Sequence, residues 1–140
     1  MFIGSYYNKL EGKGRLTLPK VYRQVSSDFT LTRGLDGQLF LFKSSDFQGE
    51  LEKLNALSYF KANNRQVVRF LAGNAVNLTV DKLGRLNVPD FLLEAAGIKK
   101  DVVIVGNGAR IEIWDQVKYH QLLDNLTLQV ADLAEQIDLD

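Results

Sequence analysis

The chain contains the stretch Gly14-Arg15-Leu16-Thr17-Leu18-Pro19 and repeats it 70 residues later as Gly84-Arg85-Leu86-Asn87-Val88-Pro89. Four of the six positions are identical in the two stretches. Self-similarity at a fixed spacing is typical of a duplicated structural unit. The sequence therefore predicts two copies of one small module within 140 residues.

The likeness continues on both sides of the two hexapeptides. Glu11 corresponds to Asp81, and Gly34 corresponds to Gly106 after a shift of two residues. The apolar runs correspond as well, 29–32 with 102–105 and 39–42 with 111–114. We expect the first repeat with its helices at residues 1–73 and the second with a C-terminal helix at 74–140. A chain of this length has room for one shared core, so the two repeats are expected to form one compact unit.

Local signals predict the same order of elements in each copy: strand, glycine turn, short strand, short helix and hairpin. Pro19 and Pro89 are suited to helix starts, so residues 20–24 and 90–96 are predicted to be short helices. Gly97 is a natural residue to end the second of them. Each short strand should therefore stop at its proline.

Hairpins and longer helices follow. Turns are expected at residues 35–37 and 106–108, between β-prone apolar runs. Residues 45–48 have a capping-box pattern, and two helices are predicted to meet near residues 61–64. From Asp115 onward a helix is expected, with one apolar stripe along its length. The residues of that stripe are Tyr119, Leu122, Leu123, Leu126, Val130, Leu133 and Ile137.

The composition, with 46% hydrophobic and 24% charged residues, is that of a soluble globular protein. Without cysteine, neither a disulfide nor a thiolate metal site can form. His120 is the only imidazole, so we expect no metal site, no cofactor, no catalytic residue and no small-molecule substrate. The apolar runs are too short to span a bilayer, and residues 1–4 lead directly into a predicted strand. Neither a membrane anchor nor an export signal is expected.

Charge is distributed unevenly along a chain whose formal net charge is zero. Residues 1–70 carry 11 Lys and Arg against 6 Asp and Glu, and residues 71–140 carry 6 against 11. Residues 124–140 contain five acidic side chains and no basic one, which leaves the preceding residues at +5. A basic surface of the kind that attracts nucleic acid is therefore compatible with the neutral chain.

The two glycine turns carry the candidate DNA-binding residues, which are Lys13, Gly14, Arg15, Lys82, Gly84 and Arg85. Glycine lets the backbone bend and approach a partner closely, and the planar arginine fork can donate two parallel hydrogen bonds to phosphate or guanine. An alternative role is internal pairing of each arginine with the carboxylate four residues earlier, Glu11 or Asp81. Both roles can hold together, because a carboxylate that braces the loop would also aim the arginine.

The D-x-x-x-R pattern is complete at Asp81–Arg85 and nearly so at Glu11–Arg15, and each copy is followed by a strand that ends at proline. Together with residues 1–4, the Pro19-x-x-x-Arg23 segment and the strand 111–114, this pattern resembles the MraZ family over essentially the whole chain. The resemblance implies an α+β fold, a pseudo-two-fold AbrB-like double-psi or swapped-hairpin β-barrel built from two repeats. Its core would comprise residues 1–45 and 74–114, with flanking helices packed around it.

The resemblance also implies a function. MraZ proteins are transcription regulators that bind G-rich direct repeats in double-stranded promoter DNA, upstream of the division and cell-wall gene cluster. A cytoplasmic, nucleoid-associated protein that forms a ring-shaped homo-oligomer is therefore expected.

The motif positions carry over one by one. Arg15 and Arg85 would contact DNA with Lys13 beside the first, while Glu11 and Asp81 brace the loops. Glu11 departs from the usual aspartate, which puts the bracing of the first loop in question. The other hypothesis is an assembly or toxin–antitoxin-type module of the same barrel class that binds a protein, and salt dependence separates it from DNA binding.

Overall fold

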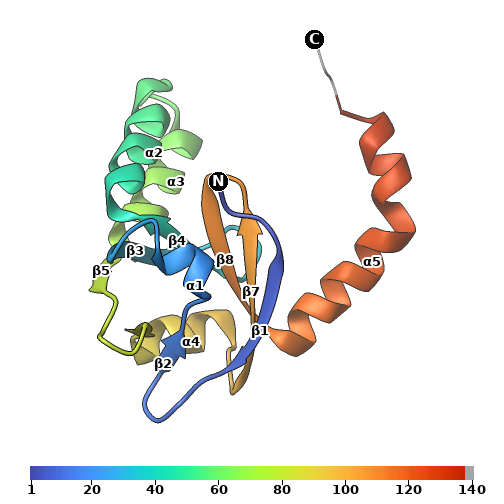
Figure 1. Cartoon of the computed structure of the whole chain (residues 1–140). Helices are drawn as coiled ribbons and strands as arrows, with labels where there is room; N and C mark the ends of the chain where they lie inside the picture. The colour runs from blue at the N-terminus through green and yellow to red at the C-terminus, as the bar shows by residue number, and fades with distance from the viewer. Residues whose placement is uncertain (138–140) are drawn as a thin grey trace.

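The computed structural model describes residues 1–137, in which strands and helices alternate as the two repeats predict (Figure 1). In chain order the elements are β1 Ser5–Lys9, β2 Arg15–Thr17, α1 Lys20–Arg23, β3 Asp28–Arg33, β4 Leu39–Lys43, α2 Ser44–Ala56, α3 Ala62–Gly73, β5 Val76–Thr79, β6 Arg85–Asn87, α4 Asp90–Ala96, β7 Asp101–Asn107, β8 Arg110–Asp115 and α5 Gln116–Glu135. The mixed α+β class is confirmed.

The two repeats exchange their first strands. The six-stranded antiparallel sheet has the order β1-β7-β8-β4-β3-β5. Thus β1 of the first repeat pairs with β7 of the second, and β5 of the second pairs with β3 of the first. The centre of the sheet is the β4–β8 pair, where Phe40 lies opposite Glu112. A pseudo-two-fold axis therefore relates the repeats within one continuous sheet.

Alternation along β4 gives the sheet two buried faces. Leu39 and Leu41 point into the main core, which both repeats build together. Phe40 and Phe42 point to the other face and pack with Phe47 of α2 and with α3. The α2–α3 hairpin thus covers one side of the sheet (Figure 1). Near-continuous apolar strands are what a sheet covered on both faces requires.

The closed barrel expected from the resemblance is not found within residues 1–137. The hydrogen-bonded ladder leaves β1 and β5 as the edges of an open sheet. A separate ribbon of β2 and β6 contacts these two edge strands. Each ribbon strand is only three residues long, and its ladder pairs with the other ribbon strand rather than with the sheet.

Two local predictions need correction. The capping box at residues 45–48 is wrong, because β4 runs directly into α2 and the helix begins at Ser44 after an uncapped Lys43. Gln48 instead donates to Glu52, one turn further along. The second hairpin turns at residues 108–109 rather than 106–108, since β7 continues to Asn107. By contrast, Gly97 ends α4 in the left-handed conformation with φ 63°, as predicted.

The C-terminal helix α5 contacts the sheet only through its start and then extends away from it (Figure 1). Asp115 caps it by accepting the Lys118 N–H, as the start predicted at this residue implies. Unlike the packed helix that the sequence predicted, α5 buries none of its residues. Its apolar stripe is therefore exposed along residues 123–137, with Val130 at 57% and Ile137 at 61% exposure.

Candidate nucleic-acid interface

The ribbon of β2 and β6 brings the two glycine loops together. Its register pairs Arg15 with Asn87, Leu16 with Leu86 and Thr17 with Arg85. Leu16 and Leu86 are fully buried. Because side chains alternate along a strand, the four polar side chains that flank these leucines lie on the opposite, outward face. Both arginines therefore belong to one short two-stranded surface.

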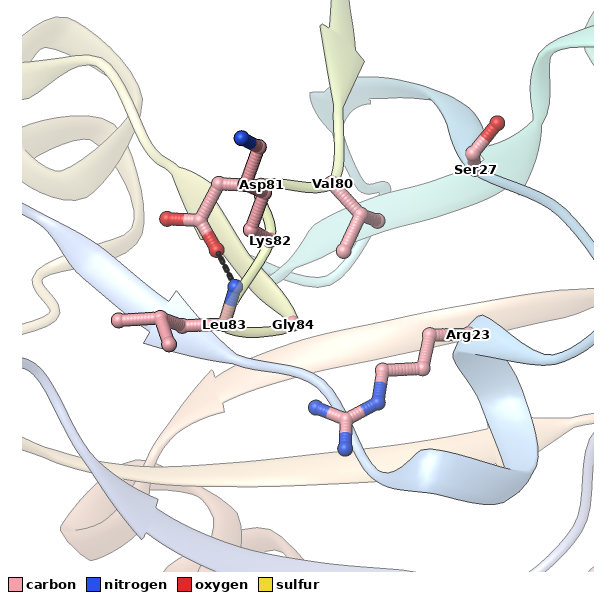
Figure 2. A pocket seen from close by; sticks show the side chains of 7 residues that line it. All are labelled: Arg23, Ser27, Val80, Asp81, Lys82, Leu83 and Gly84. Carbon is pink, nitrogen blue, oxygen red and sulfur yellow. Dashed lines mark hydrogen bonds between the residues drawn. The ribbon is translucent and has the colours of Figure 1, made fainter.

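Asp81 organises the second loop, at residues 81–85. Its Oδ1 accepts the Leu83 N–H at 2.9 Å (Figure 2). The same oxygen accepts the Arg85 N–H at 2.9 Å, and Oδ2 accepts from Arg85 Nε at 3.0 Å. The N–H of Arg85 most of all, with the Arg85 guanidinium and the Leu83 N–H, holds the pKa of Asp81 below its ordinary value. The loop is thus braced by a carboxylate that also aims the arginine.

The first loop, at residues 11–15, is closed by main-chain bonds and not by a side-chain brace. Glu11 and Arg15 exchange backbone hydrogen bonds at 2.9 and 3.0 Å. Within residues 1–137 the Arg15 guanidinium has no ion pair or hydrogen bond. The Glu11 carboxylate instead faces Arg85, with Oε2 3.7 Å from its Nη1. Internal pairing within the loop is therefore present at Arg85 and not seen at Arg15.

Gly14 and Gly84 are buried, so their part in the proposed site is to position the loops. Both have φ of 80°, which side-chain-bearing residues rarely adopt. The carbonyl of Gly14 accepts the Val88 N–H, and that of Gly84 accepts the Leu18 N–H. A Cβ at Gly14 would lie 2.4 Å from the Val88 carbonyl oxygen. Only glycine lets the loop close on the ribbon.

Lys13 and Lys82 are exposed on the two loops, where the sequence placed them. Asn87 and Thr17 were not among the candidates, although strand alternation around Leu16 and Leu86 was a signal that could have found them. Asparagine matters on such a face because its amide can pair with adenine in two hydrogen bonds.

Arg23 is the other residue that sequence reasoning missed. It extends from α1 toward the second loop (Figure 2). Its Nη1 lies so close to Gly84 that a Cβ at Gly84 would clash with it. Comparison of the repeats does not reveal this role, since the corresponding residue of the second repeat is Leu93.

The described residues 1–137 contain no group of three or more His, Cys, Asp or Glu side chains that could hold a metal ion. His120 lies by the first strand, with Nε2 2.9 Å from the Tyr7 hydroxyl. No helix in that part of the chain is long and apolar enough to cross a membrane. What the ribbon surface offers chemically is recognition, with guanidinium, ammonium and amide donors on a rigid backbone.

A family model described as "MraZ protein, putative antitoxin-like" matches the chain twice, over residues 1–70 and 71–139. The Transcriptional regulator MraZ of Pediococcus pentosaceus is 38% identical over 138 residues, which cover 98% of this chain and 96% of that protein. Proteins of the same name from Finegoldia magna and Heliobacterium modesticaldum are each 39% identical over 142 residues, covering 100% of this chain and 99% of theirs. Both the family model and these relatives extend over almost the full sequence. The chain therefore belongs to the MraZ family.

Proposed function

We propose that this protein is a sequence-specific, DNA-binding transcription regulator of the MraZ type. Its relatives are named as transcriptional regulators, and the sequence match to them extends over almost their whole length. The proposal places DNA on the outward face of the β2–β6 ribbon. It assigns base contacts to Arg15 and Arg85, supporting contacts to Lys13 and Lys82, and loop positioning to Gly14 and Gly84.

The register of the ribbon is the observation that carries this proposal. It places Arg15 opposite Asn87 and Arg85 opposite Thr17, on one face. A two-stranded ribbon is narrow enough to enter the major groove, where arginine can donate to O6 and N7 of one guanine. Two arginines on such a ribbon match G-rich sites. The binding site we propose is a set of G-rich direct repeats in double-stranded promoter DNA, upstream of the division and cell-wall gene cluster.

Assembly completes the proposed mechanism. The exposed stripe of α5 is an unpartnered apolar surface of the kind that joins copies of a chain. We propose a ring-shaped homo-oligomer, in which successive subunits contact successive repeats and weak contacts add through effective concentration. Subunits related by the rotation of a ring all face the same way along the DNA, so they match direct repeats better than a palindrome. A cytoplasmic, nucleoid-associated location and a swapped-hairpin relation to AbrB belong to the same proposal, and no catalytic residue or cofactor is assigned.

A protein-binding or assembly module is the second candidate function. Two observations favour it: the family description includes the word antitoxin-like, and α5 exposes leucines at 123, 126, 128 and 133. The two candidates respond differently to salt. Contacts to DNA phosphates release counterions, so DNA affinity falls steeply as salt rises, whereas an apolar interface changes little.

The test compares a G-rich direct-repeat duplex with a scrambled duplex of equal length by fluorescence anisotropy at several salt concentrations. We expect tighter binding to the repeat duplex and a marked loss of that preference in Arg15→Ala/Arg85→Ala. Circular dichroism and light scattering on the same samples check that the variant keeps its fold and mass. Unchanged affinity and preference in the folded double variant would remove the proposed site.

A further inference from the structure

Two hollows flank the glycine loops at equivalent places in the two repeats. The first has a volume of about 510 Å³ and is lined by Leu10, Gly14 and Leu93. The second has a volume of about 330 Å³ and is lined by Val80, Gly84 and Arg23 (Figure 2). Each residue of the first set lies 70 positions from its counterpart in the second. The pseudo-two-fold axis passes through the ribbon at Leu16 and Leu86, so the hollows lie on opposite sides of it.

Cations without partners gather at these hollows. Within residues 1–137, eight of the 17 Lys and Arg side chains have no ion pair, side-chain hydrogen bond or aromatic contact. Six of the eight lie in the loops or line the hollows: Lys13, Arg15, Arg23, Lys82, Lys99 and Lys100. The other two are Lys20 and Lys61.

The lining of the first hollow is basic overall. Lys13, Lys99 and Lys100 line it together with one carboxylate, Asp90. Lys99 and Lys100 belong to the turn between α4 and β7, and the carbonyl of Lys100 accepts the Leu10 N–H. This bond fixes the turn beside the first loop, so Lys99 and Lys100 line the same hollow as Lys13.

The second hollow is basic for a different reason. Arg23 and Lys82 line it, and its one carboxylate belongs to Asp81. Both Asp81 oxygens already accept hydrogen bonds from Arg85 or from loop amides. Asp81 thus forms its ion pair with Arg85, and Arg23 has no ion pair within residues 1–137.

We propose that the two hollows are seats for backbone phosphates of the DNA whose bases Arg15 and Arg85 read. This inference rests on the proposed DNA-binding function and deepens it. A groove is bordered by one phosphate strand on each side, and the hollows border the ribbon in the same way. Ammonium and guanidinium groups around an open hollow suit a phosphate oxygen, and phosphate contacts fix register without reading sequence.

The test replaces the two lysines of the first seat together, as Lys99→Ala/Lys100→Ala. Anisotropy is measured on repeat and scrambled duplexes over a salt series. We expect both duplexes to lose affinity by the same factor, the preference between them to stay unchanged, and the slope of log K against log salt to become less steep by about 0.9 per lost phosphate contact. The melting temperature should not change, since neither side chain has an ion pair or side-chain hydrogen bond within residues 1–137.

The matched control is Lys53→Ala/Lys61→Ala, which removes two charges from the α2–α3 hairpin. A less steep slope in Lys99→Ala/Lys100→Ala but not in this control supports the seat, whereas an unchanged slope, or an equal change in both, overturns it. A parallel titration with inorganic phosphate separates a site for free phosphate from a site for DNA phosphates. If Lys99→Ala/Lys100→Ala abolishes the binding of inorganic phosphate but leaves the salt slope of DNA binding unchanged, the proposed DNA seat is also overturned. Failure of the DNA-binding proposal looks different, because wild type itself then shows no preference between duplexes.

For the second seat, Arg23→Lys keeps the charge and Arg23→Ala removes it. A phosphate contact predicts that Arg23→Ala weakens both duplexes equally and that Arg23→Lys restores most of the salt slope. If Arg23 only supports the Gly84 loop, both variants lower the melting temperature, and neither changes the slope. That result would overturn the second seat.

Discussion

The Glu11 carboxylate of the first loop faces the Arg85 guanidinium of the second, with Oε2 and Nη1 3.7 Å apart. Arg85 thus has two acidic neighbours, because Asp81 already accepts its Nε–H at 3.0 Å. Among the described residues 1–137, Arg15, its counterpart in the other repeat, pairs with no carboxylate. In that part of the chain the repeated motif therefore gives one ion-paired arginine and one unpaired arginine on the same ribbon.

Replacing Glu11 with aspartate should restore the missing brace of the first loop. The shorter carboxylate would accept the N–H at 13 as a new bond, as Asp81 accepts that of Leu83. The Arg15 N–H, which now donates to the Glu11 carbonyl, would move to the carboxylate, as the Arg85 N–H donates to Asp81. Hydrogen bonds of this kind contribute about 0.5–1.5 kcal/mol each, and about 1 kcal/mol raises the melting temperature by roughly 2–4 °C in a chain of this length. Differential scanning fluorimetry of Glu11→Asp beside Glu11→Gln is the measurement. A lower melting temperature in the aspartate variant would show that the contact with Arg85 matters more than the brace.

Alanine at the two arginines should have unequal effects on stability. Arg15→Ala is expected to leave the melting temperature unchanged, since its guanidinium has no partner within the described residues. Arg85→Ala should lower it, because Asp81 and Glu11 lose their cation. If each arginine reads a guanine, each variant should lose about 1–3 kcal/mol of binding free energy for the G-rich repeat duplex. Melting curves and anisotropy on the same preparations check this, and equal melting temperatures would contradict it.

The stability contributed by Asp81 should depend on pH. Its pKa is lower in the folded chain than in the unfolded one, so the contribution is present above the unfolded pKa, about 3.9 for an aspartate. It is lost as pH falls through the folded pKa. The gap in melting temperature between wild type and Asp81→Asn should therefore be widest at pH 6–7, narrowing steadily as acid is added. A gap of constant size from pH 2 to pH 7 would mean that the charge of Asp81 is not what stabilises the loop.

Gly14→Ala should lower the stability of the fold more than a glycine substitution that causes backbone strain alone. Gly14 and Gly37 have φ of 80° and 91°, but a Cβ meets the Val88 carbonyl oxygen at 2.4 Å in the first case and open space in the second. Gly37→Ala is therefore the matched control for strain, which costs about 1–3 kcal/mol. We expect Gly14→Ala to lose more stability than this control and to lose DNA binding. Equal destabilisation by chemical denaturation would argue against close packing of the loop on the ribbon.

Charge placed on the apolar stripe of α5 should dissociate the proposed ring. Leu126 and Leu133 lie two turns apart on one face, so Leu126→Lys/Leu133→Lys brings like charges into any interface that uses the stripe. Multi-angle light scattering should then give a smaller mass than for wild type. Gln121→Lys, on the other side of the helix, is the control. An unchanged mass in the double variant would place the assembly surface elsewhere.

Most of the fold could be predicted from the repeat, because the same local signals for strands, turns and helices occur in both copies. Nearly all elements were predicted from proline before a helix, glycine after one, and β-prone apolar runs. The exchange of first strands and the open sheet were not predictable in this way, since strand pairing depends on contacts far apart in sequence. The capping pattern at Ser45 failed because a strand ran straight into the helix, which no local pattern reports.

The candidate site was predicted in its residues but not in its geometry. The sequence put Arg15 beside Glu11 and Arg85 beside Asp81 as equivalent pairs. Only the fold shows that the extra methylene of Glu11 lets it reach across to the other loop. Arg23 was noted only as part of the Pro19-x-x-x-Arg23 segment and not as a site residue. It has no basic counterpart in the second repeat, and a search for duplicated residues cannot find one that occurs once.

The exchange of first strands has a consequence for the reading of DNA direction. A homodimer with two identical halves approaches a duplex in the same way from either end, so it carries no sense of polarity. Here the two halves are covalently joined, and they have been free to diverge: Arg23 is matched by Leu93, and a loop braced by a carboxylate is matched by one that is not. Rotation of this chain by 180° about its pseudo-two-fold axis therefore presents a different surface to the duplex. The two repeats are arranged symmetrically, but their side chains give the chain two distinguishable ends.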